Sequence, residues 1–154
     1  MRITIAALFA LAGLLPLPAA AQERIQNEWL RGQVLHVENG PLAIGRAPPG
    51  WLSAGWIMVG MPGGATVRIR NAWQRSRYLH IEYGALEASA IRPGWLSAVW
   101  VVEPVPGTGL VRLRNTWRPE IYIHVQDQRP EAGPIQPGWN SAMWRLVPMS
   151  GPPD

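Results

Sequence analysis

Short stretches in which apolar and polar residues alternate recur along most of the chain. Ile69 lies between two arginines, and His80 lies between Leu79 and Ile81. A period of two residues is typical of a β-strand with one buried face. Glycines and prolines separate these stretches, at the places where turns interrupt strands. No segment shows a helical period over a useful length, so the pattern predicts an all-β protein.

The alternating stretches belong to a repeat of 44 residues. All nine tryptophans and all three histidines recur at this spacing, which is the signature of an internally repeated fold. The tryptophans form the sets Trp29, Trp73 and Trp117; Trp51, Trp95 and Trp139; and Trp56, Trp100 and Trp144. The repeats cover residues 24–67, 68–111 and 112–148. In the second repeat the pattern predicts strands at residues 67–71, 78–83, 86–90 and 99–104.

Three consecutive four-stranded units predict one domain, residues 22–148, with a β-trefoil fold and pseudo-threefold symmetry. A short tail, residues 149–154, follows it. The first and fourth strands of each trefoil unit close a barrel, so the tryptophans that begin the fourth strands are expected in the core: Trp56, Trp100 and Trp144. A β-prism also contains three four-stranded units and is the alternative. A propeller needs about four blades to close.

The repeat reads R-[IL]-x-N-x-W, then H-[IV], then PGW-x-SA-x-W. This pattern resembles the ricin B-type lectin superfamily of β-trefoils over Arg24 to Pro148. Where that family carries Gln-x-Trp, the tryptophan is present here, but the glutamine is replaced by Ala54, Ala98 and Ala142. The aspartate of the family's galactose-type site is missing from the matching stretches. The resemblance implies a trefoil fold and a carbohydrate-binding function.

The first 21 residues have the organisation of a secretory signal peptide. Arg2 precedes an apolar run from Ile3 to Leu15, and Ala19–Ala21 supplies the small residues that signal peptidase reads. We expect cleavage before Gln22 and export to the periplasm or the exterior. No later segment is long and apolar enough to predict a membrane span in the mature chain. Cysteine is absent, so disulfides and thiol chemistry are excluded.

Few residues suit catalysis, metal binding or nucleic-acid binding. The carboxylates do not recur as a facing pair, and no phosphate loop or zinc spacing is present. We therefore predict a non-enzymatic protein without cofactor or metal. The chain carries 14 arginines and no lysine, against 10 acidic residues, a formal net charge of +4. The arginines are spread over all repeats, so the sequence does not favour nucleic-acid binding.

The recurrent histidines are expected on the outward face of each second strand, because they alternate with apolar residues: His36, His80 and His124. A turn centred on Gln74 and Arg75 pairs Arg70 with His80 and Arg68 with Glu82. The same spacing pairs Arg24 with Glu38, and Arg114 with His124. A register slip of one residue brings the three histidines to the threefold axis instead.

The predicted binding residues cluster around the Asn-x-Trp segment of each repeat. An exposed indole stacks on the apolar face of a sugar ring, and an amide pairs with hydroxyl groups. The candidates are Trp29, Trp73, Trp117, Asn27, Asn71, Asn115, His36, His80, His124 and, in repeat two only, Tyr83. For the asparagines the alternative is capping of the loop backbone, and for the tryptophans it is covering the barrel end.

The set Trp51, Trp95 and Trp139 follows Pro-Gly, and either packing or ligand contact fits this position. Repeat three replaces the glycine turn of the other repeats by Asp127-Gln128-Arg129, so its site is expected to differ. The sequence thus predicts an exported glycan-binding module with up to three equivalent weak sites. The alternative is a protein-binding trefoil, an inhibitor or an envelope partner subunit, that uses one loop, at residues 60–66 or 105–110. Symmetry that only preserves folding is a third possibility.

Overall fold

The structure is a computed structural model that describes residues 21–149. The predicted signal peptide, apart from Ala21, and the predicted tail, apart from Met149, lie outside the described residues. The strands are β1 (Gln22–Asn27), β2 (Val34–His36), β3 (Ala43–Gly45), β4 (Trp56–Gly60), β5 (Val67–Asn71), β6 (Tyr78–His80), β7 (Glu87–Ser89), β8 (Trp100–Val105), β9 (Leu110–Asn115), β10 (Tyr122–Gln126), β11 (Arg129–Gly133) and β12 (Trp144–Pro148). Single 3₁₀ turns are η1 (Leu52–Ala54), η2 (Leu96–Ala98) and η3 (Asn140–Ala142). The all-β class is confirmed.

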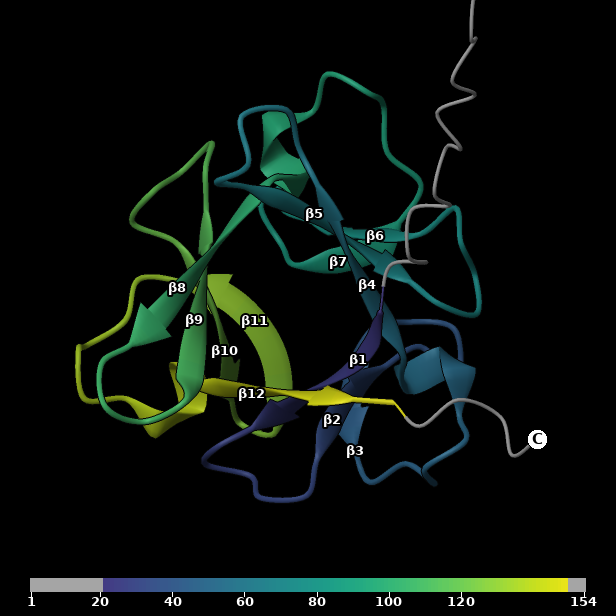
Figure 1. Cartoon of the computed structure of the whole chain (residues 1–154), viewed down its shortest axis with the longest axis vertical. Coiled ribbons are helices and arrows are strands. Elements are labelled where there is room, and N and C mark those ends of the chain that lie inside the picture. The colour runs from purple at the N-terminus through teal and green to yellow at the C-terminus, as the bar shows by residue number, and fades with distance from the viewer. Residues whose placement is uncertain (1–20, 150–154) are drawn as a thin grey trace, which may run out of the picture.

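Six of the strands close into a barrel by antiparallel pairing. Going round the barrel, β1 pairs with β4, β4 with β5, β5 with β8, β8 with β9, β9 with β12, and β12 with β1. The remaining strands form the hairpins β2–β3, β6–β7 and β10–β11. Figure 1 shows the resulting three lobes around a common centre. All strands belong to one sheet, which differs from the separate sheets of the β-prism considered above.

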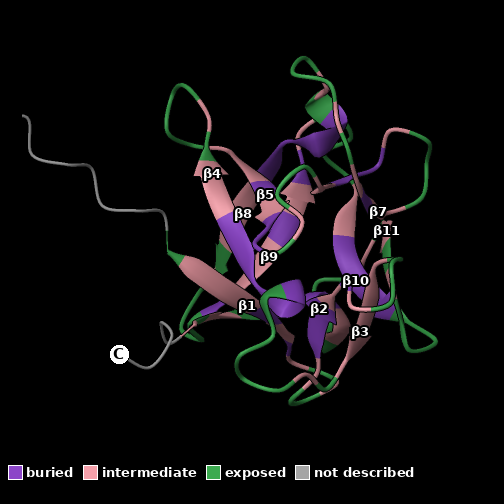
Figure 2. Ribbon diagram, turned by 90° about the vertical axis from the view of Figure 1, so that its right-hand side faces the viewer, coloured by how far each residue is buried: buried purple, intermediate pink, exposed green. Residues whose placement is uncertain are grey.

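The core contains one set of recurrent tryptophans, as predicted. Trp56, Trp100 and Trp144 are completely buried among the apolar residues of the barrel and hairpin strands. Each indole N–H donates a hydrogen bond of 2.9 Å to a carbonyl of the second strand in its own repeat, on Leu35, Leu79 and Ile123. The polar end of each ring is thereby satisfied while its large apolar surface is removed from water. Figure 2 shows buried residues on the strands and the 3₁₀ turns, and exposed residues mainly on the loops.

An arginine opens each repeat and connects its first strand to a later loop. The guanidinium groups of Arg24, Arg68 and Arg112 donate hydrogen bonds to the carbonyls of Ala47, Pro93 and Pro137. These carbonyls lie just before the Trp51, Trp95 and Trp139 turns. The arginines therefore hold the loops that carry these tryptophans against the barrel.

The predicted cross-strand pairs are wrong by two residues. Arg70 lies opposite Tyr78 rather than His80, and Arg114 opposite Tyr122 rather than His124. The cause is the shape of the intervening loop. The Asn71 N–H donates to the Arg77 carbonyl at 2.9 Å, and the Arg77 N–H donates to the Gln74 carbonyl at 3.0 Å. These bonds close the loop earlier than a turn centred between residues 74 and 75.

Candidate functional site

Three related pockets lie where one repeat meets the next. Each is lined by the Pro-Gly-Trp loop of one repeat and the Asn-x-Trp tryptophan of the following repeat. Junction pocket 1–2 is lined by Glu38, Gly50, Trp51, Leu52, Ser53 and Trp73. Junction pocket 2–3 is lined by Glu82, Gly94, Trp95, Leu96, Ser97 and Trp117. Junction pocket 3–1 is lined by Trp29, Val125, Gln126, Asp127, Gly138, Trp139, Asn140 and Ser141.

The pockets are small, open and aromatic. Their volumes are about 330, 230 and 360 Å³ for junctions 1–2, 2–3 and 3–1, around the lower end of the range for small-molecule sites. The Asn-x-Trp indoles are substantially exposed, at 54% for Trp29, 49% for Trp73 and 41% for Trp117. Large exposed apolar side chains that cluster in this way mark binding surfaces. The predicted tryptophans therefore lie at the surface, not in the core.

The Pro-Gly-Trp tryptophans combine the two roles that the sequence left open. Trp51 and Trp139 are each 37% exposed, and all three line a junction pocket. Trp95 also packs edge-on against His80, with 5.5 Å between ring centroids, and Trp139 packs against His124 at 5.8 Å. One side of these indoles is thus fixed by packing while another side contributes to the pocket wall.

The recurrent asparagines are buried, with exposures of 1% or less. The Asn71 Oδ1 accepts hydrogen bonds from the backbone N–H groups of Trp73 and Gln74, at 3.1 and 2.9 Å. Its Nδ2 donates to the carbonyls of Ser53 and Gly55, at 3.1 and 3.3 Å. Asn27 and Asn115 form corresponding bonds to their own loops and to Ser141 and Ser97.

These bonds correct the sequence interpretation of Asn27, Asn71 and Asn115. Their amides are engaged by the backbone, the alternative given above, and do not face a ligand. Each amide instead ties the loop of an exposed tryptophan to the serine-bearing loop of the neighbouring repeat. The asparagines therefore position the two walls of each pocket.

A serine–carboxylate pair contributes polar groups to two of the pockets. The Ser53 hydroxyl donates to Glu38 Oε2 at 2.5 Å, and the Ser97 hydroxyl donates to Glu82 Oε2 at the same distance. Both serines are buried and both glutamates are half-buried. The sequence analysis did not predict that these carboxylates line a pocket, because it considered carboxylates only as facing pairs. The available signal was a glutamate placed 15 residues before the recurrent serine in two of the repeats.

Junction pocket 3–1 differs, as expected from the altered turn. Asp127 and Gln128 have left-handed φ angles of 47° and 59°, and they allow β10 to continue to Gln126. The corresponding strands of repeats one and two end two residues earlier, at the histidine. Gln126 pairs with Arg129 in the hairpin and is exposed. Junction pocket 3–1 therefore has Gln126 and Ser141 in its lining where the other two pockets have a hydrogen-bonded glutamate and serine.

The expectation that the histidines face outward is wrong. His80 is completely buried, His124 is 6% exposed and His36 is half-buried. The alternating pattern correctly distinguished the two faces of the second strand in each repeat. The face that carries the histidine is nevertheless also covered, by the third strand and the Pro-Gly-Trp loop. His80 contacts Ser89 of β7, Trp95, and the exposed ring of Tyr83, whose centroid lies 6.2 Å away. Tyr83 and Trp95 extend this aromatic cluster to the surface.

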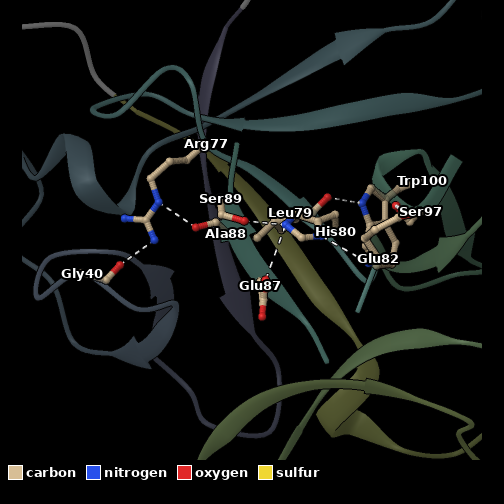
Figure 3. A network of polar contacts seen from close by, with 10 residues as sticks. All are labelled: Gly40, Arg77, Leu79, His80, Glu82, Glu87, Ala88, Ser89, Ser97 and Trp100. Atoms are coloured by element: carbon tan, nitrogen blue, oxygen red, sulfur yellow. Dashed lines mark hydrogen bonds and ion pairs between the residues drawn. The ribbon is translucent and has the colours of Figure 1, made fainter. Parts of the chain in front are cut away.

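The surroundings of His80 do not favour nucleophilic chemistry (Figure 3). Its Nε2 lies 2.6 Å from the Ser89 hydroxyl and 3.7 Å from Glu87 Oε2, whereas its Nδ1 accepts the Glu82 backbone N–H at 3.2 Å. A neutral ring that accepts at Nδ1 carries its proton on Nε2. His80 therefore donates to Ser89 instead of removing its proton. Burial lowers the pKa of His80, against weaker opposing effects of Glu87 and Glu82, which favours this neutral form.

The other histidines lack this serine. His36 faces Gly45 and His124 faces Gly133 at the position that Ser89 occupies. Burial also lowers the pKa of His36, whose Nδ1 accepts the Glu38 N–H at 3.3 Å. Within residues 21–149, no three His, Asp or Glu side chains are arranged to hold a metal ion. The same part of the chain contains no helix with the length and apolar character needed to cross a membrane.

The chain resembles several solved structures. One is a GlcNAcα1-4Gal-releasing endo-β-galactosidase from Clostridium perfringens, with a TM-score of 0.74 and 25% identity over 84% of this chain. Another is SeviL bound to asialo-GM1 saccharide, with a TM-score of 0.67 and 20% identity, covering 84% of this chain and 98% of SeviL. A third is the designed threefold-symmetric protein ThreeFoil, with a TM-score of 0.68 and 15% identity, covering 82% of this chain and 97% of that one.

These similarities establish the β-trefoil fold, which the resemblance to ricin B-type lectins implied. The chain spans 33% of the endo-β-galactosidase and 18% of a mosquitocidal holotoxin that it also resembles. It thus corresponds to one small module of those larger proteins. No family model and no curated protein matches the sequence.

Proposed function

We propose that the protein is a non-enzymatic carbohydrate-binding module whose ligands occupy the junction pockets. The observation that carries this proposal is the threefold recurrence of one arrangement, two indoles from adjacent repeats around a polar group. Indole faces suit the apolar C–H faces of sugar rings, and the N–H at the ring edge suits hydroxyl groups. The likeness to a trefoil lectin bound to the asialo-GM1 saccharide supports a glycan as ligand.

The polar groups complete the requirements of a sugar site. In junction pocket 1–2, Glu38 lines the pocket together with Trp51 and Trp73, and one of its oxygens accepts a hydrogen bond from the Ser53 hydroxyl. A carboxylate has acceptor capacity left after one such bond, and sugar hydroxyls are donors. Hydrophobic walls with a few placed polar groups are the usual composition of a small-ligand site. Aromatic contact then supplies affinity, and the carboxylate orients the ring.

Three sites on one rigid body act together. Weak sites gain from being linked, because the second contact is intramolecular once the first has formed. Junction pockets 1–2 and 2–3 share the serine–glutamate pair and form the similar pair of sites, whereas junction pocket 3–1 has Gln126 and Asp127. The proposed targets are therefore surfaces or polymers on which a glycan is repeated.

The proposed function includes export of the protein. Residues 1–21 have the pattern of a secretory signal. Export would bring the protein to surfaces or polymers that carry a repeated glycan. Cleavage after Ala21 leaves Gln22, the first residue of β1, at the amino end of the barrel. The N-terminal sequence of the protein recovered from its producing cell tests this part directly.

A glycan array probed with the purified protein tests carbohydrate binding. We expect bound glycans, and we expect the triple variant Trp29→Ala, Trp73→Ala and Trp117→Ala to lose them. Each lost indole contact weakens binding by about fivefold. Pro62→Ala is the matched control, because Pro62 is exposed and lines none of the pockets. A parent protein that binds no glycan, or a folded triple variant that binds as the parent does, overturns the proposal.

A further inference from the structure

Junction pocket 1–2 carries a negative charge that the described residues do not pair. Glu38 is the one charged residue in its lining. Its Oε2 accepts the Ser53 hydroxyl, and within residues 21–149 no arginine or histidine forms an ion pair with it. Burial lowers the pKa of the neighbouring His36, against a weaker opposing effect of Glu38, and this favours the neutral ring. The pocket therefore combines a carboxylate with two indoles.

In junction pocket 2–3 the indole that corresponds to Trp73 is Trp117, and a cation of the protein lies over its ring. The guanidinium carbon of Arg118 lies 4.7 Å from the ring centroid of Trp117, which lines junction pocket 2–3. A cation over an indole face is attracted by the negative charge density of the ring. The protein thus supplies its own cation to an indole that lines junction pocket 2–3, although Arg118 is not part of the pocket lining.

Within residues 21–149, the Trp73 indole of junction pocket 1–2 has no such cation over its ring. The residue after Trp73 is Gln74, in the place that Arg118 occupies after Trp117. The Gln74 Oε1 accepts a hydrogen bond of 2.8 Å from Arg77, and the rest of that guanidinium donates to the carbonyls of Ala88 and Gly40. Figure 3 shows Arg77 held between these two carbonyls. Arg77 is therefore directed to the backbone of β7 and of the turn at Gly40, and it forms no ion pair with Glu38.

We propose that junction pocket 1–2 selects sugars that carry a free amino group, bound as ammonium between Glu38 and the indoles of Trp51 and Trp73. This inference rests on the proposed function and specifies the ligand of one site. Carboxylate and indole faces both stabilise positive charge, and both disfavour acidic sugars. A compact ammonium on a single ring suits a pocket of about 330 Å³. A neutral sugar gains the stacking but not the charge interaction.

The test is a titration of the purified protein followed by the indole N–H NMR signal of Trp73, assigned with Trp73→Phe. The probes are glucosamine, N-acetylglucosamine and lysine amide at neutral pH. We expect glucosamine to bind about tenfold more tightly than N-acetylglucosamine, from one partly exposed ion pair and one cation–ring contact. Added salt is expected to reduce this preference, because it screens the charge interaction.

Matched variants identify the groups responsible. Glu38→Gln is expected to remove the preference for glucosamine while N-acetylglucosamine still binds, whereas Glu82→Gln leaves the Trp73 titration unchanged. Arg118→Gln removes the cation from the Trp117 ring, so the Trp117 signal is expected to gain a response to glucosamine.

Two sets of results overturn the inference. The first is equal binding of glucosamine and N-acetylglucosamine at Trp73, or a preference that salt and Glu38→Gln leave intact. The second is lysine amide binding as tightly as glucosamine, which assigns the pocket to protein amines. Neutral sugars that bind without any amine preference leave the proposed function standing. A protein that binds no sugar at any junction contradicts both proposals.

Discussion

Replacing Asn71 by alanine removes the contacts that join two repeats behind junction pocket 1–2. The side chain is fully buried and takes part in four hydrogen bonds, two to its own loop and two to the loop of Ser53. Alanine leaves the N–H groups of Trp73 and Gln74 without their acceptor. It also leaves the carbonyls of Ser53 and Gly55 without this donor.

The cost follows from the number and burial of the bonds. A net contribution of about 1 kcal/mol for each bond, reduced where water reaches the partly buried N–H groups, gives a loss of about 3 kcal/mol. For a domain of this size the dependence of the unfolding free energy on urea is about 2 kcal/mol per molar. The urea midpoint of Asn71→Ala is therefore expected to fall by about 1.5 M.

Urea unfolding followed by tryptophan fluorescence measures this shift. Trp73→Ala is the matched control, because it alters the same loop at a half-exposed side chain, and it is expected to change the free energy by less than about 1 kcal/mol. A midpoint for Asn71→Ala within about 0.3 M of the parent, about 0.6 kcal/mol at that slope, refutes the reasoning. It would mean that the loops hold their positions without the asparagine.

Two further predictions concern stability. Gln128→Gly is expected to raise the free energy of unfolding by about 1 kcal/mol, because Gln128 has a φ of 59° that glycine adopts without strain; an unchanged or lower urea midpoint contradicts this. Burial lowers the pKa of His80 below its ordinary value of 6.5, so the unfolded chain takes up protons first as the pH falls. The contribution of neutral His80 to the free energy of unfolding is therefore fully present above about pH 6.5, and it is lost as the pH falls below that value. The urea midpoint of the parent protein is expected to fall between pH 7 and pH 5, and that of His80→Asn is expected to fall less. An equal fall of the midpoint in the two proteins refutes the assignment of this pH dependence to His80.

The repeated residues were sufficient to predict the architecture. The 44-residue spacing predicted three related units, and alternation predicted their strands. The burial of Trp56, Trp100 and Trp144 followed from their position at the start of the barrel strands. The all-β class and the burial of these three tryptophans were predicted correctly, because burial of one strand face is a local property that the sequence records directly.

The pockets could be predicted only in part, because they depend on contacts between repeats. Trp51 and Trp73 line one pocket although they come from different units, and this proximity exists only once the barrel has closed. Alternation distinguished the two faces of the His80 strand but gave no sign that Trp95 and Ser89 cover the second. The burial of Asn71 could likewise not be predicted from the sequence, because an asparagine near a tryptophan fits a capping role and a ligand contact equally well.

The pairing of β1 with β12 has a consequence for how many ligands the module can hold. Three repeats in an open row meet at two boundaries, and the third boundary forms only when the last repeat returns to the first. Trp29 of the first repeat and Trp139 of the third both line the pocket at that boundary. A ligand bound in this pocket contacts both the first and the third repeat. Its binding therefore opposes the separation of β1 from β12.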